Sequence, residues 1–112
     1  MDDFHSAPLL AVIGGSGLYE IPGLEELAWR RVQSPWGEPS DDLLFGQIGE
    51  TPFAFLPRHG RGHSLGPSDI NYRANIDALK RSGVTDIISI SAVGSFREDL
   101  APGDFVICDQ FI

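Results

Sequence analysis

The run Pro8-Leu9-Leu10-Ala11-Val12-Ile13-Gly14-Gly15 decides the fold class of this chain. A short apolar run that ends in two glycines is typical of a buried strand followed by a tight turn. A second, β-branched run, Ile87-Ile88-Ser89-Ile90 within residues 86–92, predicts a central strand. Helix signals lie between the two runs, and this alternation predicts an α/β fold.

The helix is predicted over residues 69–82. Ser68, which follows Pro67, is a good N-cap. Basic residues in the last turn, with Gly83 just after it, are what the end of a helix prefers. The spacing places one apolar stripe on this helix, formed by Tyr72, Ile76 and Leu79.

Other extended segments are separated by turn and loop signals. The turn Gly49-Glu50-Thr51 joins residues 43–48 to residues 52–56, which predicts a hairpin. The remaining segments are an extended stretch at 24–32, a proline-containing loop at 34–40, a turn at 101–104 and a strand at 105–112. Because that last strand has no closing turn, we expect the chain to be the N-terminal part of a larger α/β domain.

Composition and charge restrict the class of protein. The 112 residues carry 16 acidic against 8 basic side chains, a formal net charge of −8, and 42% of them are hydrophobic. These values are typical of a soluble globular chain of one domain at most. No apolar run reaches the about 18 residues of a membrane span. The acidity argues against nucleic acid and anionic membranes as partners.

The single cysteine and the N-terminus indicate the compartment. Cys108 excludes an intramolecular disulfide and lies in an apolar pattern, so we expect a small buried hydrophobe in a reducing environment. Residues 1–5 are acidic and polar, unlike the basic start of a signal peptide. A cytoplasmic location is therefore expected.

A positive island interrupts this acidic chain. It is the run Arg58-His59-Gly60-Arg61-Gly62-His63, and no acidic residue occurs from position 51 to position 68. Arginine binds phosphate with two hydrogen bonds, histidine adds another, and glycines allow close approach of the backbone. The run predicts an anion site, with a solvated loop that pairs with nearby carboxylates as the alternative. A metal site at His59 and His63 is disfavoured, because no carboxylate is near in sequence and Cys108 is distant.

Two other segments could bind an anion. The turn Gly14-Gly15-Ser16-Gly17 follows the first strand, but a dinucleotide fingerprint would need glycine at Glu20, and no Walker lysine follows. Alone, it could be an ordinary tight turn. The segment Ser91-Ala92-Val93-Gly94-Ser95 lies where open α/β sheets place ligands, although it could be a plain strand-to-loop transition. Loops 14–17, 58–63 and 91–94 each follow a strand, so together they predict one buried phosphate pocket.

The ordered set of motifs is more specific than any one of them. It comprises Ile13 to Leu18, Ser34 to Ser40, Arg58 to His63, Asn71 to Asn75, Ser91 to Ser95 and Pro102 to Asp104. In order and spacing these motifs resemble the N-terminal part of the trimeric purine nucleoside phosphorylase family, within it the branch that cleaves S-methyl-5′-thioadenosine. The resemblance implies a twisted mixed β-sheet flanked by helices, with residues 1–112 as the N-terminal part of a single phosphorylase domain, incomplete in this chain.

The resemblance also implies a reaction and a site. The reaction is the phosphorolysis of S-methyl-5′-thioadenosine to adenine and 5-methylthioribose 1-phosphate by a pentosyltransferase of purine and methionine salvage. Inorganic phosphate is the co-substrate, and no metal or organic cofactor is needed. The implied phosphate contacts are Ser16, Arg58, His59, Ser91 and the backbone of Ala92. The nucleoside side is lined by Ala92, Val93 and Gly94.

The resemblance leaves part of the enzyme outside these residues. The carboxylates that read the purine are expected beyond residue 112, so no residue is assigned to assist departure of the base. The isolated 112-residue chain is therefore expected to be inactive. A homotrimer is implied, with a purine nucleoside and phosphate as small-molecule partners.

Two alternatives remain open. The first is a phosphorylase for 6-oxopurine nucleosides or methylthioinosine, since Val93 bears on the choice of base or sugar tail. The second is a non-catalytic module that binds an anion or a nucleoside through the same loops.

Overall fold

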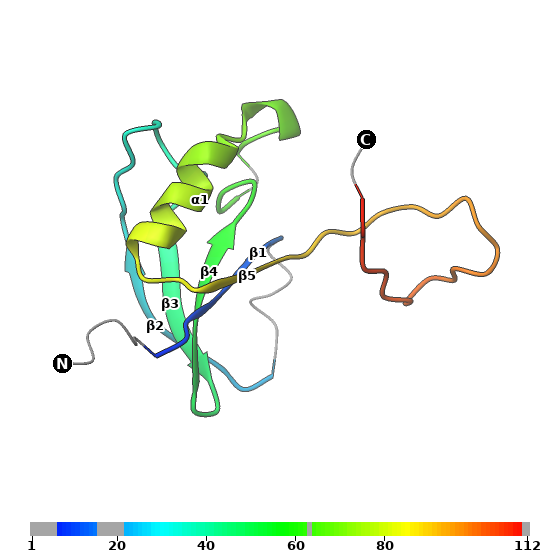
Figure 1. Ribbon diagram of the computed structural model, residues 1–112, viewed down its shortest axis with the longest axis horizontal. Coiled ribbons are helices and arrows are strands. Elements are labelled where there is room, and N and C mark those ends of the chain that lie inside the picture. Colours follow the sequence, from blue (N-terminus) through cyan, green and yellow to red (C-terminus); the bar gives the residue numbers. More distant parts are fainter. Residues whose placement is uncertain (1–6, 16–21, 63, 111–112) are drawn as a thin grey trace.

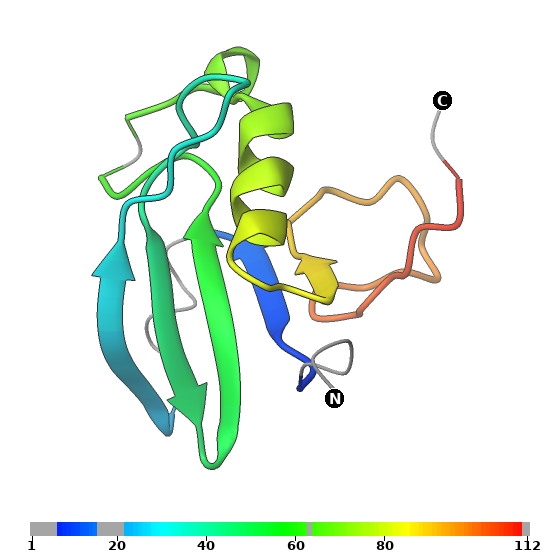
Figure 2. The ribbon, with the colours of Figure 1, turned by 60° about the vertical axis from the view of Figure 1, so that its left-hand side comes forward.

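The computed structural model describes residues 7–15, 22–62 and 64–110. Its elements are β1 (Leu10–Gly14), β2 (Leu24–Arg30), β3 (Leu43–Ile48), β4 (Thr51–Pro57), a short 3₁₀ helix (Pro67–Asp69), α1 (Tyr72–Arg81) and β5 (Asp86–Ser89). The strands form a mixed sheet in the order β2-β3-β4-β1-β5, and α1 lies against one of its faces (Figures 1 and 2). The predicted α/β class with a mixed sheet is confirmed.

The sheet has an antiparallel part and a parallel part. β3 pairs antiparallel with β2 and β4. Ile48 lies opposite Thr51, with Gly49 at φ +60° in the turn, so the predicted hairpin is confirmed. β1 pairs parallel with both β4 and β5. The carboxyl ends of these three strands therefore lie at one edge of the sheet.

Side chains alternate between the two faces of the sheet, as strand geometry requires. In β1, Ala11 and Ile13 pack with Leu79 of α1, whereas Val12 packs on the opposite face. The core under α1 consists of Ala11, Ile13, Leu43, Ala54, Leu56 and Leu79. On the other face, the buried residues are Leu44, Phe53 and Phe55. Both clusters hold the parallel strands in place beneath the loops that follow them.

The start and the buried face of α1 differ from the prediction. The helix begins at Tyr72, and its N-cap is Asn71, whose side-chain oxygen accepts a hydrogen bond from the Ala74 amide at 3.1 Å. The prediction of Ser68 as N-cap was wrong, because residues 67–69 form a separate 3₁₀ turn.

The predicted apolar stripe was right at Leu79, which is buried in the core, and wrong at its other two positions. Tyr72 and Ile76 are exposed, and the buried residues of the helix are Ala74, Asn75, Ala78 and Leu79. Small side chains let the helix pack closely on the sheet. The predicted helix end is confirmed, with Lys80 and Arg81 in the last turn and Gly83 at φ +90°.

The C-terminal part of the chain departs most from the prediction. β5 is an exposed edge strand within the described sheet, not a central one. The turn at Ala101–Asp104 is confirmed by a 3.0 Å bond from the Asp104 amide to the Ala101 carbonyl. A strand was predicted at 105–112, and the described part of it, residues 105–110, forms none. A strand needs a neighbouring strand for its backbone hydrogen bonds, and no described residue pairs with this segment.

Cys108 is exposed, so the prediction of a buried thiol was also wrong. Residues 91–110 extend away from the sheet (Figure 1, orange to red). In the part of the chain that the structure describes, no helix has the length and apolar character to cross a membrane.

Candidate functional site

The three strand ends come together as the sequence predicts. The Arg58 amide donates to the Gly14 carbonyl at 3.0 Å, and the Ile90 amide donates to the Ile13 carbonyl at 2.8 Å. These bonds join the residues after β4 and β5 to the end of β1. For the described residues, the predicted convergence of the three loops at one edge is confirmed.

Arg58 lies at the centre of this edge. Its Nη2 atom donates to the Ile90 carbonyl at 2.7 Å, to Ser89 Oγ at 3.1 Å and to the Ile13 carbonyl at 3.4 Å. The side chain is half-buried, and no carboxylate among the described residues forms an ion pair with it. Nη1 and Nε have no acceptor in the described part of the protein, so the other edge of the guanidinium can still donate to an anion.

His59 is held by the loop that it begins. Its Nδ1 atom lies 2.9 Å from the Leu65 carbonyl oxygen, and the Leu65 amide donates back to the His59 carbonyl at 3.0 Å. A carbonyl only accepts hydrogen bonds, so Nδ1 carries the proton in this contact. The bond fixes the plane of the imidazole ring beside Arg58.

Arg61 has a different role from Arg58. Its Nη2 atom lies 2.9 Å from Asp41 Oδ1 and 3.4 Å from Asp42 Oδ2, and its guanidinium stacks over Trp29 at 3.9 Å from the ring centroid. The alternative of a basic loop that pairs with nearby carboxylates therefore holds for Arg61. Arg58, by contrast, contacts the strand ends.

The contact with Arg61 lowers the pKa of the Asp41 carboxyl. Partial burial raises its pKa, but hydrogen bonds from the Arg61 side chain and amide, together with the Asp42 amide, outweigh burial and hold the pKa below its usual value. Asp41 therefore stays ionised in contact with Arg61.

The other predicted residues are placed in part. Arg58 binds the carbonyl of Ile90, and Ser91 is the next residue. The loop that starts with Ser91 therefore begins at the same edge of the sheet. Ser91, Ala92, Val93 and Gly94 are exposed in this chain, so the predicted burial of the pocket was wrong for this loop. Ser16 and His63 lie outside the described residues.

Sequence reasoning missed the polar contacts behind the loop. The side chain of Asn75 is only 2% exposed, and its Oδ1 accepts from the Ser40 amide at 2.7 Å while its Nδ2 donates to Ser40 Oγ at 3.0 Å. Asp41 and Trp29 were also missed. The available signal was an asparagine among the small residues of a helix that faces the core, since a buried amide requires partners.

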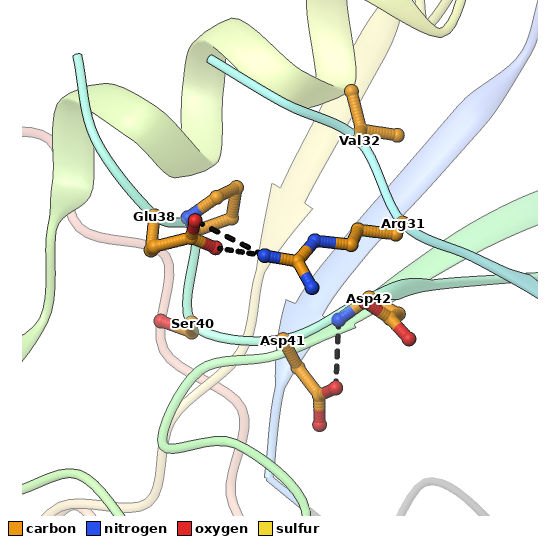
Figure 3. Close-up of a pocket in the computed structure, with 7 residues that line it drawn as sticks. Arg31, Val32, Glu38, Ser40, Asp41 and Asp42 are labelled. Carbon is orange, nitrogen blue, oxygen red and sulfur yellow. Dashed lines mark hydrogen bonds and ion pairs between the residues drawn. The ribbon is translucent and has the colours of Figure 1, made fainter. Parts of the chain in front are cut away.

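A polar pocket of about 210 Å³ lies beside these contacts, along residues 38–42. Figure 3 shows Glu38 paired with Arg31, at 3.2 Å, and the Asp41 carboxylate pointing away from that pair. The charged residues that line the pocket are Arg31 and three carboxylates, Glu38, Asp41 and Asp42. This lining repels anions, so the pocket is separate from the predicted phosphate site.

Comparison with known proteins gives a consistent result. A family model described as the phosphorylase superfamily matches residues 9–112. S-methyl-5′-thioadenosine phosphorylase of Cereibacter sphaeroides is 64% identical over 104 residues, which are 93% of this chain and 36% of that protein. The chain spans between 36% and 47% of the length of the curated relatives considered.

Solved structures agree with the sequence relatives. A mutant of adenosine/methylthioadenosine phosphorylase from Schistosoma mansoni, crystallised in complex with adenine, matches with a TM-score of 0.79 and 45% identity, covering 88% of this chain and 33% of that one. A methylthioadenosine phosphorylase from an Antarctic soil metagenomic library matches with a TM-score of 0.78 and 51% identity, covering 86% and 33%.

Proposed function

Because the chain belongs to the phosphorylase superfamily, we propose that its gene product cleaves S-methyl-5′-thioadenosine with inorganic phosphate. The products are adenine and 5-methylthioribose 1-phosphate. The names of the relatives and structural neighbours support this substrate, and the adenine in one neighbour favours a 6-amino purine. The observation that carries the proposal is Arg58, a half-buried cation at three strand ends with donors to spare.

The site would hold phosphate by donors from all three loops. In this proposal Arg58, His59, Ser16, Ser91 and the Ala92 backbone bind its oxygens. The carbonyl bonds of Arg58 fix its guanidinium, so the side chain loses little entropy when an anion binds. Charge-assisted bonds of this kind are about twice as strong as neutral ones.

The reaction follows from that placement. A phosphate oxygen attacks the anomeric carbon, the bond from that carbon to the purine nitrogen breaks, and the purine leaves with the electron pair and takes up a proton. The sugar develops positive charge in the transition state, and the fixed phosphate stabilises it. Ala92, Val93 and Gly94 would line the nucleoside side. We assign none of these 112 residues to hold the leaving purine.

The balance of the reaction needs no redox partner, since phosphate supplies the nucleophile and the purine takes up a proton. We therefore assign no organic cofactor and no metal. A cytoplasmic homotrimer, working in purine and methionine salvage, belongs to the same proposal. Light scattering on the purified gene product tests the trimer.

Phosphate-dependent release of adenine tests the function. The gene product is incubated with methylthioadenosine, methylthioinosine or inosine, each with and without phosphate, and the free bases are separated by chromatography. The proposal expects adenine release that requires phosphate. Faster hypoxanthine release would favour the 6-oxopurine alternative, whereas binding of phosphate or nucleoside without turnover would favour a non-catalytic module.

A further inference from the structure

We propose that Asp41 is a positioning residue for the phosphate-binding loop and that it acts through Arg61. This inference rests on the proposed function, since it concerns the same phosphate site. Asp41 does not face the strand ends, and its carboxylate contacts the loop two residues after His59.

Asp41 fixes both the backbone and the side chain of Arg61. Its Oδ2 atom accepts from the Arg61 amide at 2.7 Å and from Nε at 3.0 Å, and its Oδ1 accepts from Nη2 at 2.9 Å. The Asp41 side chain is only 12% exposed, and the guanidinium is stacked on Trp29. A bidentate contact to a largely buried carboxylate restricts orientation as well as distance.

The loop that carries Asp41 is itself anchored to α1. The Ser40 backbone and hydroxyl are bonded to the buried Asn75. The same loop approaches Gly60 so closely that a Cβ there would lie 3.1 Å from the Ser40 carbonyl oxygen, and Gly60 has φ +77°. A side chain at position 60 would therefore push against the Ser40 loop and would also strain the backbone.

The path from Asp41 to the phosphate donors is short. Arg61 lies between His59 and Leu65, which are bonded to each other through the His59 ring and through the Leu65 amide. The contact of Asp41 with the Arg61 amide therefore holds the loop that orients the His59 ring. Release of Arg61 would let this loop shift. A misplacement of about 1 Å can cost about 100-fold in rate.

The test compares Asp41→Asn with Glu38→Gln in the gene product. Both variants remove one carboxylate from the same loop, but Glu38 pairs with Arg31 at the surface (Figure 3). We expect Asp41→Asn to raise the KM for phosphate about tenfold, with the KM for methylthioadenosine within about twofold of wild type. Glu38→Gln should leave both constants unchanged.

A double variant identifies the route. If Asp41 acts through Arg61, Asp41→Asn combined with Arg61→Gln is no worse for phosphate than either single change. Should Asp41→Asn fail to fold, as judged by circular dichroism, Arg61→Gln carries the test, because that side chain is 47% exposed and tolerant of change. Equal phosphate KM values for Glu38→Gln and the Asp41 or Arg61 variant would overturn the inference.

Failure of the proposed function would look different. It would show as no phosphorolysis by the wild-type protein. Calorimetric titration with inorganic phosphate then provides the comparison, and weaker binding by Asp41→Asn than by Glu38→Gln is still expected. Equal affinities, or no binding by the wild type, would overturn the positioning role.

Discussion

Arg58 is a half-buried cation that bonds to the protein through one of its three nitrogens. Carbonyl oxygens carry only partial charges, so they compensate part of the desolvation cost of a guanidinium. A bound anion at Nε and Nη1 would supply the rest. In the proposed site, this one side chain would supply a large share of the binding energy of phosphate.

Replacement of Arg58 by alanine should raise the KM for phosphate about 10- to 100-fold in the gene product, because charge-assisted contacts are worth roughly 1.5–3 kcal/mol. Arg31→Ala is the matched control, since Arg31 forms an exposed ion pair with Glu38. Steady-state kinetics with varied phosphate provide the measurement. Unchanged phosphate kinetics in Arg58→Ala would remove this residue from the site.

The Asp41–Arg61 contact should make part of the stability pH-dependent. The folded-state pKa of Asp41 lies below its usual value, so the contribution is complete above the unfolded pKa of about 3.9 and is lost as the pH falls through the folded value. The difference in unfolding free energy between wild type and Asp41→Asn should therefore shrink below about pH 4. Denaturant unfolding at several pH values measures it, and a constant or growing gap would contradict the assignment.

At the scale of elements, turn chemistry and local hydrophobic pattern could be predicted, and tertiary partners could not. The β3–β4 hairpin and the end of α1 follow from adjacent residues, and both were predicted. Which face of α1 is buried depends on how closely the helix packs against the sheet. Small residues occupy the buried face, where Tyr72 and Ile76 had been predicted. Likewise, local sequence does not distinguish Arg58 from Arg61, whose different roles come from distant partners: the strand ends for Arg58 and Asp41 for Arg61.

The start of α1 gives a prediction with an internal control. Asn71→Ala removes the side chain that caps Ala74 and donates to the Trp36 carbonyl at 2.8 Å. It should lower the free energy of unfolding by about 1 kcal/mol. Ser68→Ala should change it by less than about 0.5 kcal/mol, as exposed positions usually do. Denaturant unfolding of both variants measures these changes. A larger loss of stability in Ser68→Ala than in Asn71→Ala would indicate that Ser68 is the N-cap after all.

At the scale of the whole molecule, the parallel strands bring together loops that lie far apart in sequence. The meeting of these loops at one edge could be predicted, because the parallel strands of an α/β sheet end at a common edge. The conformation of the segment after β5 could not be predicted, since the local sequence does not determine which residues it contacts. Phe96, Phe105 and Ile107 are almost fully exposed there.

Residues 1–112 produced alone should release no adenine from methylthioadenosine. The proposed phosphate contacts lie within these residues, but the purine would be unheld, and help to a leaving group is typically worth about 10²–10⁴-fold. Ultraviolet detection of adenine, with the complete gene product as the positive control, measures this. Robust release by the 112-residue chain would place the whole catalytic set within it.

The position of phosphate in a crystal of the gene product tests the central claim most directly. We expect the ion at the carboxyl edge of β1, β4 and β5, within hydrogen-bond distance, about 2.7–2.9 Å, of Nη1 or Nε of Arg58. It should also contact His59 and the backbone at Ala92. Phosphate bound elsewhere, with those Arg58 donors taken up by a carboxylate of the protein, would contradict the account.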